Sequence, residues 1–245
     1  MDQTAVFASS GMRSRVEALD MLANNLANAA TSGYKLDREF YSLFTGDAGA
    51  DGEGQIAQLP QVKSHWTDFT QGTLVPTGNP LDLALDGQGF FVINSPTGPR
   101  YTRNGSFQLS TAGVLTAPDG YPVAGTTGQI QTQSQAPIEV TADGAVQQEG
   151  QVIGQLQIVD FKDKTALEKM GNSYFVNSKP AQQPTPAQPQ VVQAHVEGSN
   201  VSPAEAAVRL VGVMRQSEML QKAISTATDM NKQALQEVAK VGGAP

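Results

Sequence analysis

The chain contains no cysteine among its 245 residues, and it has only two histidines and one tryptophan. The absence of cysteine excludes disulfide frameworks, thiolate metal sites and cysteine nucleophiles. Aromatic residues make up only 6% of the chain, whereas glycine (24) and proline (14) are frequent. This composition predicts many turns around a thin hydrophobic core.

Long apolar segments are also absent. No run approaches the roughly 18 residues that a membrane helix requires, and acidic residues interrupt the first thirty positions. The net charge of −7 disfavours a broad nucleic-acid surface. We therefore expect no membrane insertion, no nucleic-acid partner and no cleavable signal peptide.

Sequence patterns of catalytic, metal and cofactor sites are missing or incomplete. Neither His65 nor His195 accompanies a nucleophile turn of the form Gly-x-Ser-x-Gly. The acids of 45–55 do not have EF-hand spacing, and Gly87-Gln88-Gly89 precedes an apolar run typical of a strand rather than a helix. We expect no catalytic residue, metal or cofactor, and hence no enzyme, although a site assembled only by folding stays open.

The N-terminal residues 1–30 have the pattern of an amphipathic helix. They contain no proline and a single glycine, Gly11. Their apolar positions step by four and three residues, which places them on one helical stripe. These positions are Met12, Val16, Leu19, Ala23 and Leu26.

A second and longer helix is predicted at the C-terminal end. Ser202, Pro203 and Glu205 match an N-cap, a first-turn proline and a capping-box acid. The following residues fit the apolar positions of a heptad repeat, which suits a helix packed against other helices. The heptad positions are Leu210, Val213, Ser217, Leu220, Ile224, Ala227, Asn231, Ala234 and Val238.

The middle of the chain has the pattern of a β-domain. Turn dipeptides recur at 51–52, 86–87, 104–105, 119–120 and 143–144, each pairing Asp or Asn with Gly. Short apolar or alternating runs lie between them, at 81–85, 89–93, 106–110, 137–141 and 154–161. The spacing predicts a small barrel or sandwich.

Together these patterns predict an α+β fold in which the terminal helices pair as a coiled-coil-like unit and a central all-β domain lies between them. The Pro-rich stretch 179–190 is expected to be extended, because proline interrupts both helices and central strands. The expected divisions are an N-terminal helix (1–30), an extended connector (31–80) with a flexible loop (45–55), the β-domain (81–178), an extended linker (179–198) and a C-terminal helix (199–245).

Three motifs in the same order resemble those of the bacterial flagellar axial proteins, the family of rod, hook and hook-associated proteins. Residues 24–35 read NNLANAATSGYK, similar to the N-terminal signature of that family. Residues 81–93 and 101–125 resemble the β-domain shared by rod and hook proteins, and 196–226 resembles the C-terminal signature. Within the family, the short length and the run at 199–206 resemble the proximal-rod members, with the distal-rod members as the alternative.

The resemblance implies a structural subunit of the basal-body rod that polymerises through its terminal helices into a hollow axial shaft. It further implies that the partners are copies of the chain, other rod subunits and the flagellar type III export apparatus, and that the rod lies in the periplasm. The residues expected at subunit interfaces are Met12, Val16, Leu19, Asn24, Asn25, Leu26, Asn28, Gly33, Tyr34, Asn200, Leu210, Val213, Leu220, Ile224, Ala227 and Asn231.

Other interpretations stay open at the level of sequence. The asparagines of 24–28 are also typical of a fraying helix end, with Gly33 as a left-handed cap. A hook-type subunit, a β-domain that binds cell-wall carbohydrate and a free-standing adaptor are further alternatives for the whole chain.

Overall fold

The computed structural model describes residues 3–45, 58–134 and 136–241, and the chain forms two compact units. Unit 1 combines Met1–Ala27, Asp37–Trp66 and Ser202–Pro245, and unit 2 combines Asn28–Leu36 and Thr67–Val201. Side chains are described for 11–38, 66–134, 136–226, 228–230, 232, 233 and 236. The loop expected to be flexible at 45–55 falls outside the described residues from position 46 onward.

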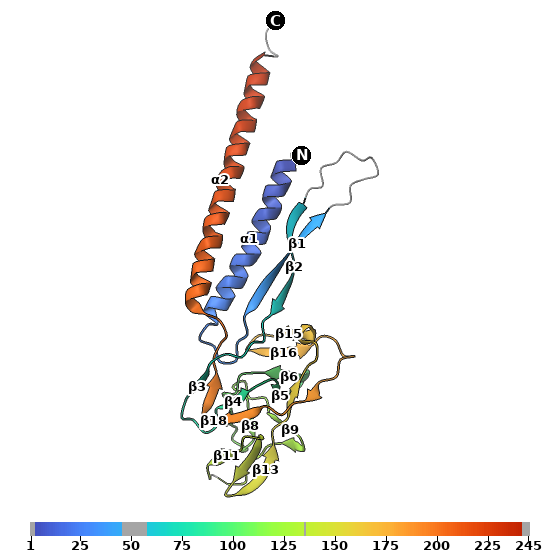
Figure 1. Ribbon diagram of the computed structural model, residues 1–245, viewed down its shortest axis with the longest axis vertical. Coiled ribbons are helices and arrows are strands. Elements are labelled where there is room, and N and C mark those ends of the chain that lie inside the picture. The colour runs from blue at the N-terminus through green and yellow to red at the C-terminus, as the bar shows by residue number, and fades with distance from the viewer. Residues whose placement is uncertain (1–2, 46–57, 135, 242–245) are drawn as a thin grey trace. The chain divides into compact units, whose positions relative to one another are not determined.

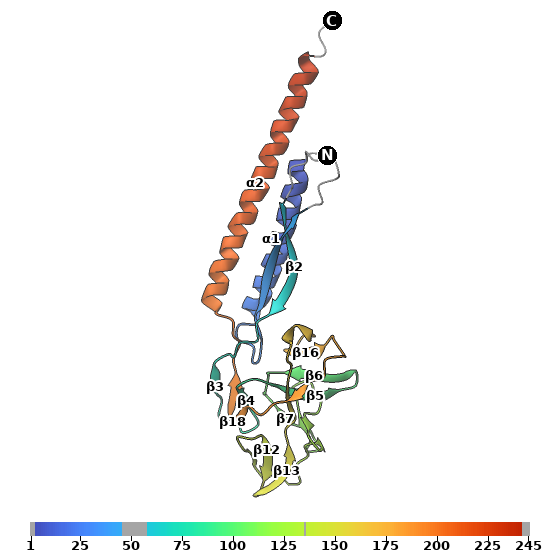
Figure 2. The ribbon, with the colours of Figure 1, turned by 45° about the vertical axis from the view of Figure 1, so that its right-hand side comes forward.

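Unit 1 is built from two long helices and a two-stranded sheet. Helix α1 (Gln3–Ala27) and helix α2 (Pro203–Val241) lie side by side and run in opposite directions (Figures 1 and 2). Strands β1 (Asp37–Thr45) and β2 (Gln58–Thr67) pair with each other, and β1 contacts α1. Helix α2 has 39 residues against 25 in α1, and its C-terminal part extends past the N-terminal end of α1.

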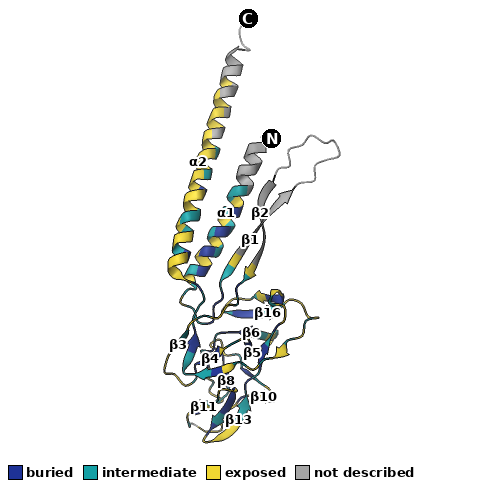
Figure 3. Cartoon of the chain, viewed as in Figure 1, coloured by how far each residue is buried: buried dark blue, intermediate teal, exposed yellow. Residues whose placement is uncertain are grey.

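The start and the inner face of α2 agree with the sequence prediction. The helix begins at Pro203, and the backbone N–H of Ala206 donates to the carbonyl of Ser202 at 2.9 Å. The predicted heptad positions from 210 to 224 are buried or half-buried, while most of the helix is exposed (Figure 3). The heptad therefore marks the side of α2 that packs inside unit 1.

The buried face of α1 differs from the predicted stripe. The buried positions are Ser14, Ala18, Leu22 and Asn25, whereas Val16 is 45% exposed. Helix α1 contacts both α2 and β1. A helix with two neighbours does not need one continuous stripe of large apolar residues, because small and amide side chains allow a second element to approach closely.

Unit 2 contains the remaining strands, and every strand pairing described for it is antiparallel. Its largest sheet has six strands in the order β15-β16-β6-β5-β14-β17. Smaller sheets pair β3 with β19, β4 with β18, β7 with β8 and β9 with β10, and join β11, β12 and β13. The bounds are β3 (Leu74–Pro76), β4 (Leu83–Asp86), β5 (Phe90–Ser95), β6 (Gly98–Thr102), β7 (Gln108–Leu109), β8 (Leu115–Thr116), β9 (Ala124–Gly125), β10 (Gly128–Gln129), β11 (Ile138–Val140), β12 (Ala145–Gln148), β13 (Gln151–Gln155), β14 (Ile158–Asp160), β15 (Leu167–Lys169), β16 (Tyr174–Asn177), β17 (Thr185–Pro186), β18 (Gln190–Gln193) and β19 (His195–Glu197), with a short 3-10 helix η1 (Lys164–Ala166).

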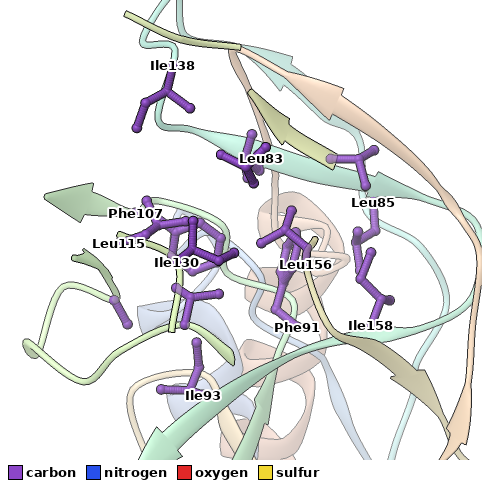
Figure 4. Close-up of a cluster of buried hydrophobic side chains, with 14 of the residues drawn as sticks. Leu83, Leu85, Phe91, Ile93, Phe107, Leu115, Ile130, Ile138, Leu156 and Ile158 are labelled. Atoms are coloured by element: carbon purple, nitrogen blue, oxygen red, sulfur yellow. The ribbon is translucent and has the colours of Figure 1, made fainter. Parts of the chain in front are cut away.

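Two apolar clusters fill unit 2, and strand β5 separates them. Alternate residues of a strand point to opposite faces, so Phe91 and Ile93 enter one cluster while Phe90 and Val92 enter the other. The first cluster gathers side chains from strands far apart in the sequence, including Leu83, Leu156 and Ile158 (Figure 4). The second is mainly aromatic, with Phe90 and Phe175 edge to face at 5.8 Å between ring centroids.

The predicted turn glycines fall into two groups. Gly87, Gly120 and Gly144 have positive φ angles (117°, 85° and 83°), as their Asp-Gly turns require. Gly105 does not, and a Cβ built on it would lie 1.7 Å from the carbonyl oxygen of Leu83. Glycine is needed at position 105 because two backbone segments touch there, which the turn dipeptide alone does not reveal.

The stretch expected to be an extended linker, 179–198, carries strands within unit 2. Strand β17 lies at the edge of the six-stranded sheet, where Pro186 needs no ladder N–H, and β18 and β19 pair with β4 and β3. The connector 31–80 likewise contains β1, β2 and β3. These short strands pair with strands far away in the sequence. Local composition therefore predicts extended backbone but does not predict which strand it pairs with.

Replacing Phe91 with alanine should destabilise unit 2 by about 3–5 kcal/mol, because the fully buried ring leaves a cavity. The control is Val152→Ala on β13, which is 63% exposed and should change stability by less than about 0.5 kcal/mol. Urea unfolding of the full chain, followed by near-ultraviolet circular dichroism of its tyrosines, measures both. Equal midpoints for the two variants would contradict the assignment of the core.

Candidate assembly site

Asn25, within the N-terminal motif, uses its amide inside unit 1. Its side chain is 1% exposed. The Nδ2 group donates to the carbonyl of Asp37 at 2.8 Å, and Oδ1 accepts the backbone N–H of Asp37 at 3.0 Å. The amide thus pairs with both backbone groups of Asp37, as a neighbouring strand residue would, and fixes the start of β1 to the end of α1.

The residues that follow α1 form a tight turn in unit 2. The backbone N–H of Thr31 donates to the carbonyl of Asn28 at 3.1 Å, and that of Tyr34 donates to the carbonyl of Thr31 at 3.2 Å. Gly33 has a φ of 69°, as predicted, and donates its N–H to the carbonyl of Glu197 at 2.7 Å. A Cβ at Gly33 would lie 2.2 Å from the backbone nitrogen of Asn104, so no other residue fits.

Lys35, the last residue of the motif, is fully buried and ion-paired. Its Nζ lies 2.5 Å from Oε1 of Glu197 and donates to the carbonyl of Thr70 at 2.7 Å. Burial lowers the pKa of Lys35 below its ordinary 10.5, and the charge and hydrogen bond of Glu197 oppose that shift. A fully buried ammonium is tolerated here because it has an anionic partner and a carbonyl acceptor.

Glu197 is the centre of this buried charge cluster, which we define as Lys35, Arg103 and Glu197. Its Oε2 accepts a hydrogen bond from Arg103 at 3.1 Å, and its Oε1 also accepts the backbone N–H of Gly72 at 2.9 Å. Arg103 donates in turn to the carbonyl of Gly87 at 2.8 Å, and its guanidinium lies 5.4 Å from the centroid of the Phe90 ring. The carboxylate therefore joins strand β19 to three other segments of unit 2.

Asn200 makes a second set of links beside the cluster. Its Oδ1 accepts the backbone N–H of Leu36 at 2.8 Å, and its Nδ2 donates to the carbonyl of Asp68 at 2.8 Å and to the hydroxyl of Thr70 at 3.0 Å. The N–H of Asp68 donates to the carbonyl of Leu36 at 2.8 Å. One amide side chain thus joins its own segment to two others, at 36 and at 68–70.

The buried charge cluster and Asn200 bind together the segments of unit 2 that continue into unit 1. The chain leaves or enters unit 2 at 27–28, 36–37, 66–67 and 201–202. Lys35 and Leu36, Asp68 and Thr70, and Glu197 and Asn200 are bonded to one another within a few residues of three of these points. In this site, charged and amide side chains hold backbone segments in position.

The structure brings together only some of the residues that the sequence predicted for subunit interfaces. Gly33, Tyr34 and Asn200 lie in one region of unit 2, and Tyr34 is buried beneath Lys169, whose Nζ is 4.1 Å from the ring centroid. The others lie on the helices or just after them: Asn24 and Val16 exposed, Asn25 buried, and Met12, Leu19, Leu26, Asn28, Leu210, Val213, Leu220 and Ile224 half-buried. Ala227 and Asn231 lie in α2, but their side chains are outside the described residues.

Sequence reasoning missed the buried charge cluster as a unit. Lys35 and Glu197 each lie in one of the terminal motifs, and Arg103 lies in the β-domain motif, but 162 residues separate the first two. The available signal was Lys35 itself, the one charged residue in the 24–35 motif. Its partner could not be chosen, because the chain offers 23 acidic side chains.

Two further observations bear on the kind of site. None of the helices in the described part of the chain is long and apolar enough to cross a membrane. Within the same residues, no group of three or more His, Asp or Glu side chains is placed to hold a metal ion.

Comparison with protein families gives three matches, in the order of the motifs. Residues 7–35 match the model described as flagella basal body rod protein. Residues 84–152 match the flagellar hook protein FlgE/F/G D1 domain, and residues 192–237 match the flagellar basal body rod FlgEFG protein C-terminal model. Lys35, Arg103 and Glu197 each fall inside one of the three matched ranges.

Relatives of known family match over most of their length. The flagellar basal-body rod protein FlgF of Caulobacter vibrioides is 30% identical, over 91% of this chain and 92% of the relative. The flagellar basal-body rod protein FlgG of Agrobacterium fabrum is 32% identical, over 91% and 94%. A FlgF of Mesorhizobium japonicum is 30% identical, over 89% and 90%. With three family models matched in order and such relatives aligned nearly end to end, the chain belongs to the flagellar basal-body rod protein family.

Proposed function

We propose that this chain is a structural subunit of the rod in the bacterial flagellar basal body. It polymerises through its terminal helices into a hollow axial shaft. The observation that carries the proposal is the apolar surface left uncovered on α2: Val208 is 74% exposed, Met219 is 64% exposed and Met230 is 65% exposed. A helix with this much uncovered apolar surface is typical of a surface that another molecule covers.

Within one subunit, the proposal treats α1 and α2 as a coiled-coil-like pair. The heptad positions of α2 support it, since Ala206, Leu210, Val213 and Ser217 alternate by four and three residues on its buried side. Ser217 is 8% exposed. A small polar residue in such a seam lets two helices approach and fixes their register.

The predicted interface residues take two different roles in this proposal. Asn25, Gly33, Tyr34 and Asn200 bond or pack inside the chain, so we infer that they shape the ends of the helices rather than touch a neighbour. Asn24 and Val16 are exposed and are placed at the contact itself. Buried amides such as Asn25 hold the helix ends in one arrangement within each subunit, so every copy presents the same contact surface.

The position in the rod is proposed as proximal, with the distal rod as the second candidate. Relatives named FlgF and FlgG match with identities of 30% and 32%, which favours neither branch. The short chain and the Ser-Asn-Val-Ser-Pro-Ala-Glu-Ala run at 199–206 support the proximal assignment. The partners proposed are copies of this chain and other rod subunits.

The route to the rod is proposed to be export through the flagellar type III apparatus into the periplasm, without a cleavable signal peptide. The absence of cysteine supports passage into an oxidising compartment, since an unfolded chain then has no thiol to cross-link. Unit 2 must fold after export, and the buried charge cluster requires that Lys35 and Glu197 meet across 162 residues. Lys35, in the N-terminal motif, therefore gains its ionic partner Glu197 only after the C-terminal motif has been exported.

Deleting residues 203–245, or residues 1–30, should abolish rod assembly and motility, because either change removes one of the paired helices. Electron microscopy of basal bodies from cells that make only the truncated chain provides the measurement, with immunoblots to show that the chain accumulates. Val152→Ala serves as the full-length control and should give normal rods. Normal rods from either truncation would contradict the proposal.

Replacing Glu197 with glutamine should destabilise the chain by about 3–5 kcal/mol at neutral pH, because Lys35 and Arg103 keep their charges without an anion. The control is Glu168→Gln, because Glu168 is the exposed residue of β15. The double variant Lys35→Met with Glu197→Gln should lose less than the sum of the single changes, since the two residues are coupled. Urea unfolding measures each loss, and a Glu197→Gln midpoint equal to that of the control would refute the role of the cluster.

The loss caused by Glu197→Gln should shrink as the pH rises toward 10.5. The folded pKa of Lys35 already lies below its unfolded value, so the unfolded chain binds more protons between the two and stability increases with pH there. Glu197 opposes this shift, so replacing it lowers the folded pKa of Lys35 further. The pH range over which stability rises then becomes wider. Urea midpoints of the variant measured between pH 7 and pH 10 test the sign, and a deficit that grows with pH would contradict it.

A further inference from the structure

Helix α2 has a second ordered face, opposite to the one packed inside unit 1. Positions 206, 210, 213, 217, 220 and 224 are buried or half-buried. Residues about two positions away are turned by roughly 200° and are exposed. We define this outer face of α2 by Val208, Val211, Arg215, Met219, Lys222 and Met230, all exposed.

The apolar members of this face are regularly spaced. Val208, Met219 and Met230 follow one another at intervals of eleven residues, which is close to three helical turns. Two cations, Arg215 and Lys222, lie two turns apart within the same stripe, and Glu218 lies on its flank. The result is a row of valine and methionine side chains with two cations in its first part, and Thr226 and Asp229 lie on the same side of the helix close to Met230.

Helix α1 also has an exposed face, and this face has smaller side chains and a negative charge where the outer face of α2 has large side chains and positive charges. Val16, Asp20, Ala23 and Ala27 are exposed and step by four, three and four residues, which places them on one side of the helix. Most of these side chains are small, and the charged one is a carboxylate. We define these four residues as the outer face of α1.

We propose that the outer face of α2 binds the outer face of α1 in a second copy of the chain. This inference rests on the proposed function and names the surfaces through which it operates. Large side chains on one helix and alanines on the other allow close packing, because helices approach to about 8–10 Å only where side chains interdigitate. Asp20 of one copy then lies between the Arg215 and Lys222 side chains of the next.

The pairing also determines the form of the assembly. The two faces are different surfaces of the same molecule, so the contact is head to tail and leaves one free face of each kind at the ends. Such a contact extends without closing on itself in pairs. The heptad seam of α2 does not contribute, because it is already occupied within the subunit.

Charge reversal tests the pairing without disturbing either fold, because all three charged residues are exposed. Asp20→Lys alone, and Arg215→Glu with Lys222→Glu, should each lower the number of rods per cell at least tenfold. Combining the three changes in one chain should restore rods, because every contact is then reversed. Failure of the combined variant to recover, with circular dichroism equal to that of the unchanged chain, would overturn the proposal.

Cross-linking tests proximity directly, because the chain has no cysteine of its own. Ala23→Cys and Met219→Cys in one chain, treated with a short bismaleimide in isolated basal bodies, should give a ladder of covalent multimers. Replacing Met219→Cys by Gln221→Cys moves the thiol to another exposed side of α2 and should reduce the ladder at least tenfold. Basal bodies that contain the chain but give no ladder overturn the pairing alone, whereas basal bodies that lack the chain overturn the proposed function as well.

Discussion

The contact on which the rest of unit 2 depends is a single carboxylate buried between two cations. Glu197 has no exposed surface, and each of its oxygens accepts a hydrogen bond from a charged side chain. Removing a charge from water costs several kcal/mol unless its partners are well placed, so this cluster forms only when all its segments are in position. Glycine at position 33 and the amide of Asn200 belong to the same requirement, since both bring backbone against the segments that carry Lys35 and Glu197. We infer that the cluster mainly specifies how these segments meet, because burying its charges offsets much of their mutual attraction.

The two units bury their apolar side chains to different extents. Unit 2 closes on itself, with aromatic and aliphatic side chains packed on both sides of β5. Unit 1 has too little sheet to cover its helices, and α2 leaves valine and methionine side chains in water. Methionine suits such a surface because its flexible side chain adapts to an irregular neighbour. A protein that must be stable alone and also join a polymer can assign these tasks to separate parts of one chain.

The sequence predicted elements well where one local rule decides the structure. Pro203 begins α2, Gly33 adopts positive φ, and the turn dipeptides at 87, 120 and 144 have the expected backbone. The inner face of α2 follows from its heptad. The sequence does not reveal features that two distant segments decide together: Ser14 and Asn25 are buried on α1 beside Ala18 and Leu22, and Gly105 is required by the carbonyl of Leu83. The ion pairs of Glu197 are of this kind, because spacing along the chain contains no information about a partner 162 residues away.

The difference in length between α1 and α2 has a consequence for growth. The last turns of α2 extend beyond the helix beside them, so α1 does not cover them. In a shaft built through the head-to-tail contact proposed above, the newest copy leaves one outer face free, and this free face can bind the next copy. Elongation of this kind has no internal stopping point. A chemically different protein must therefore mark where one segment of the axle ends and the next begins.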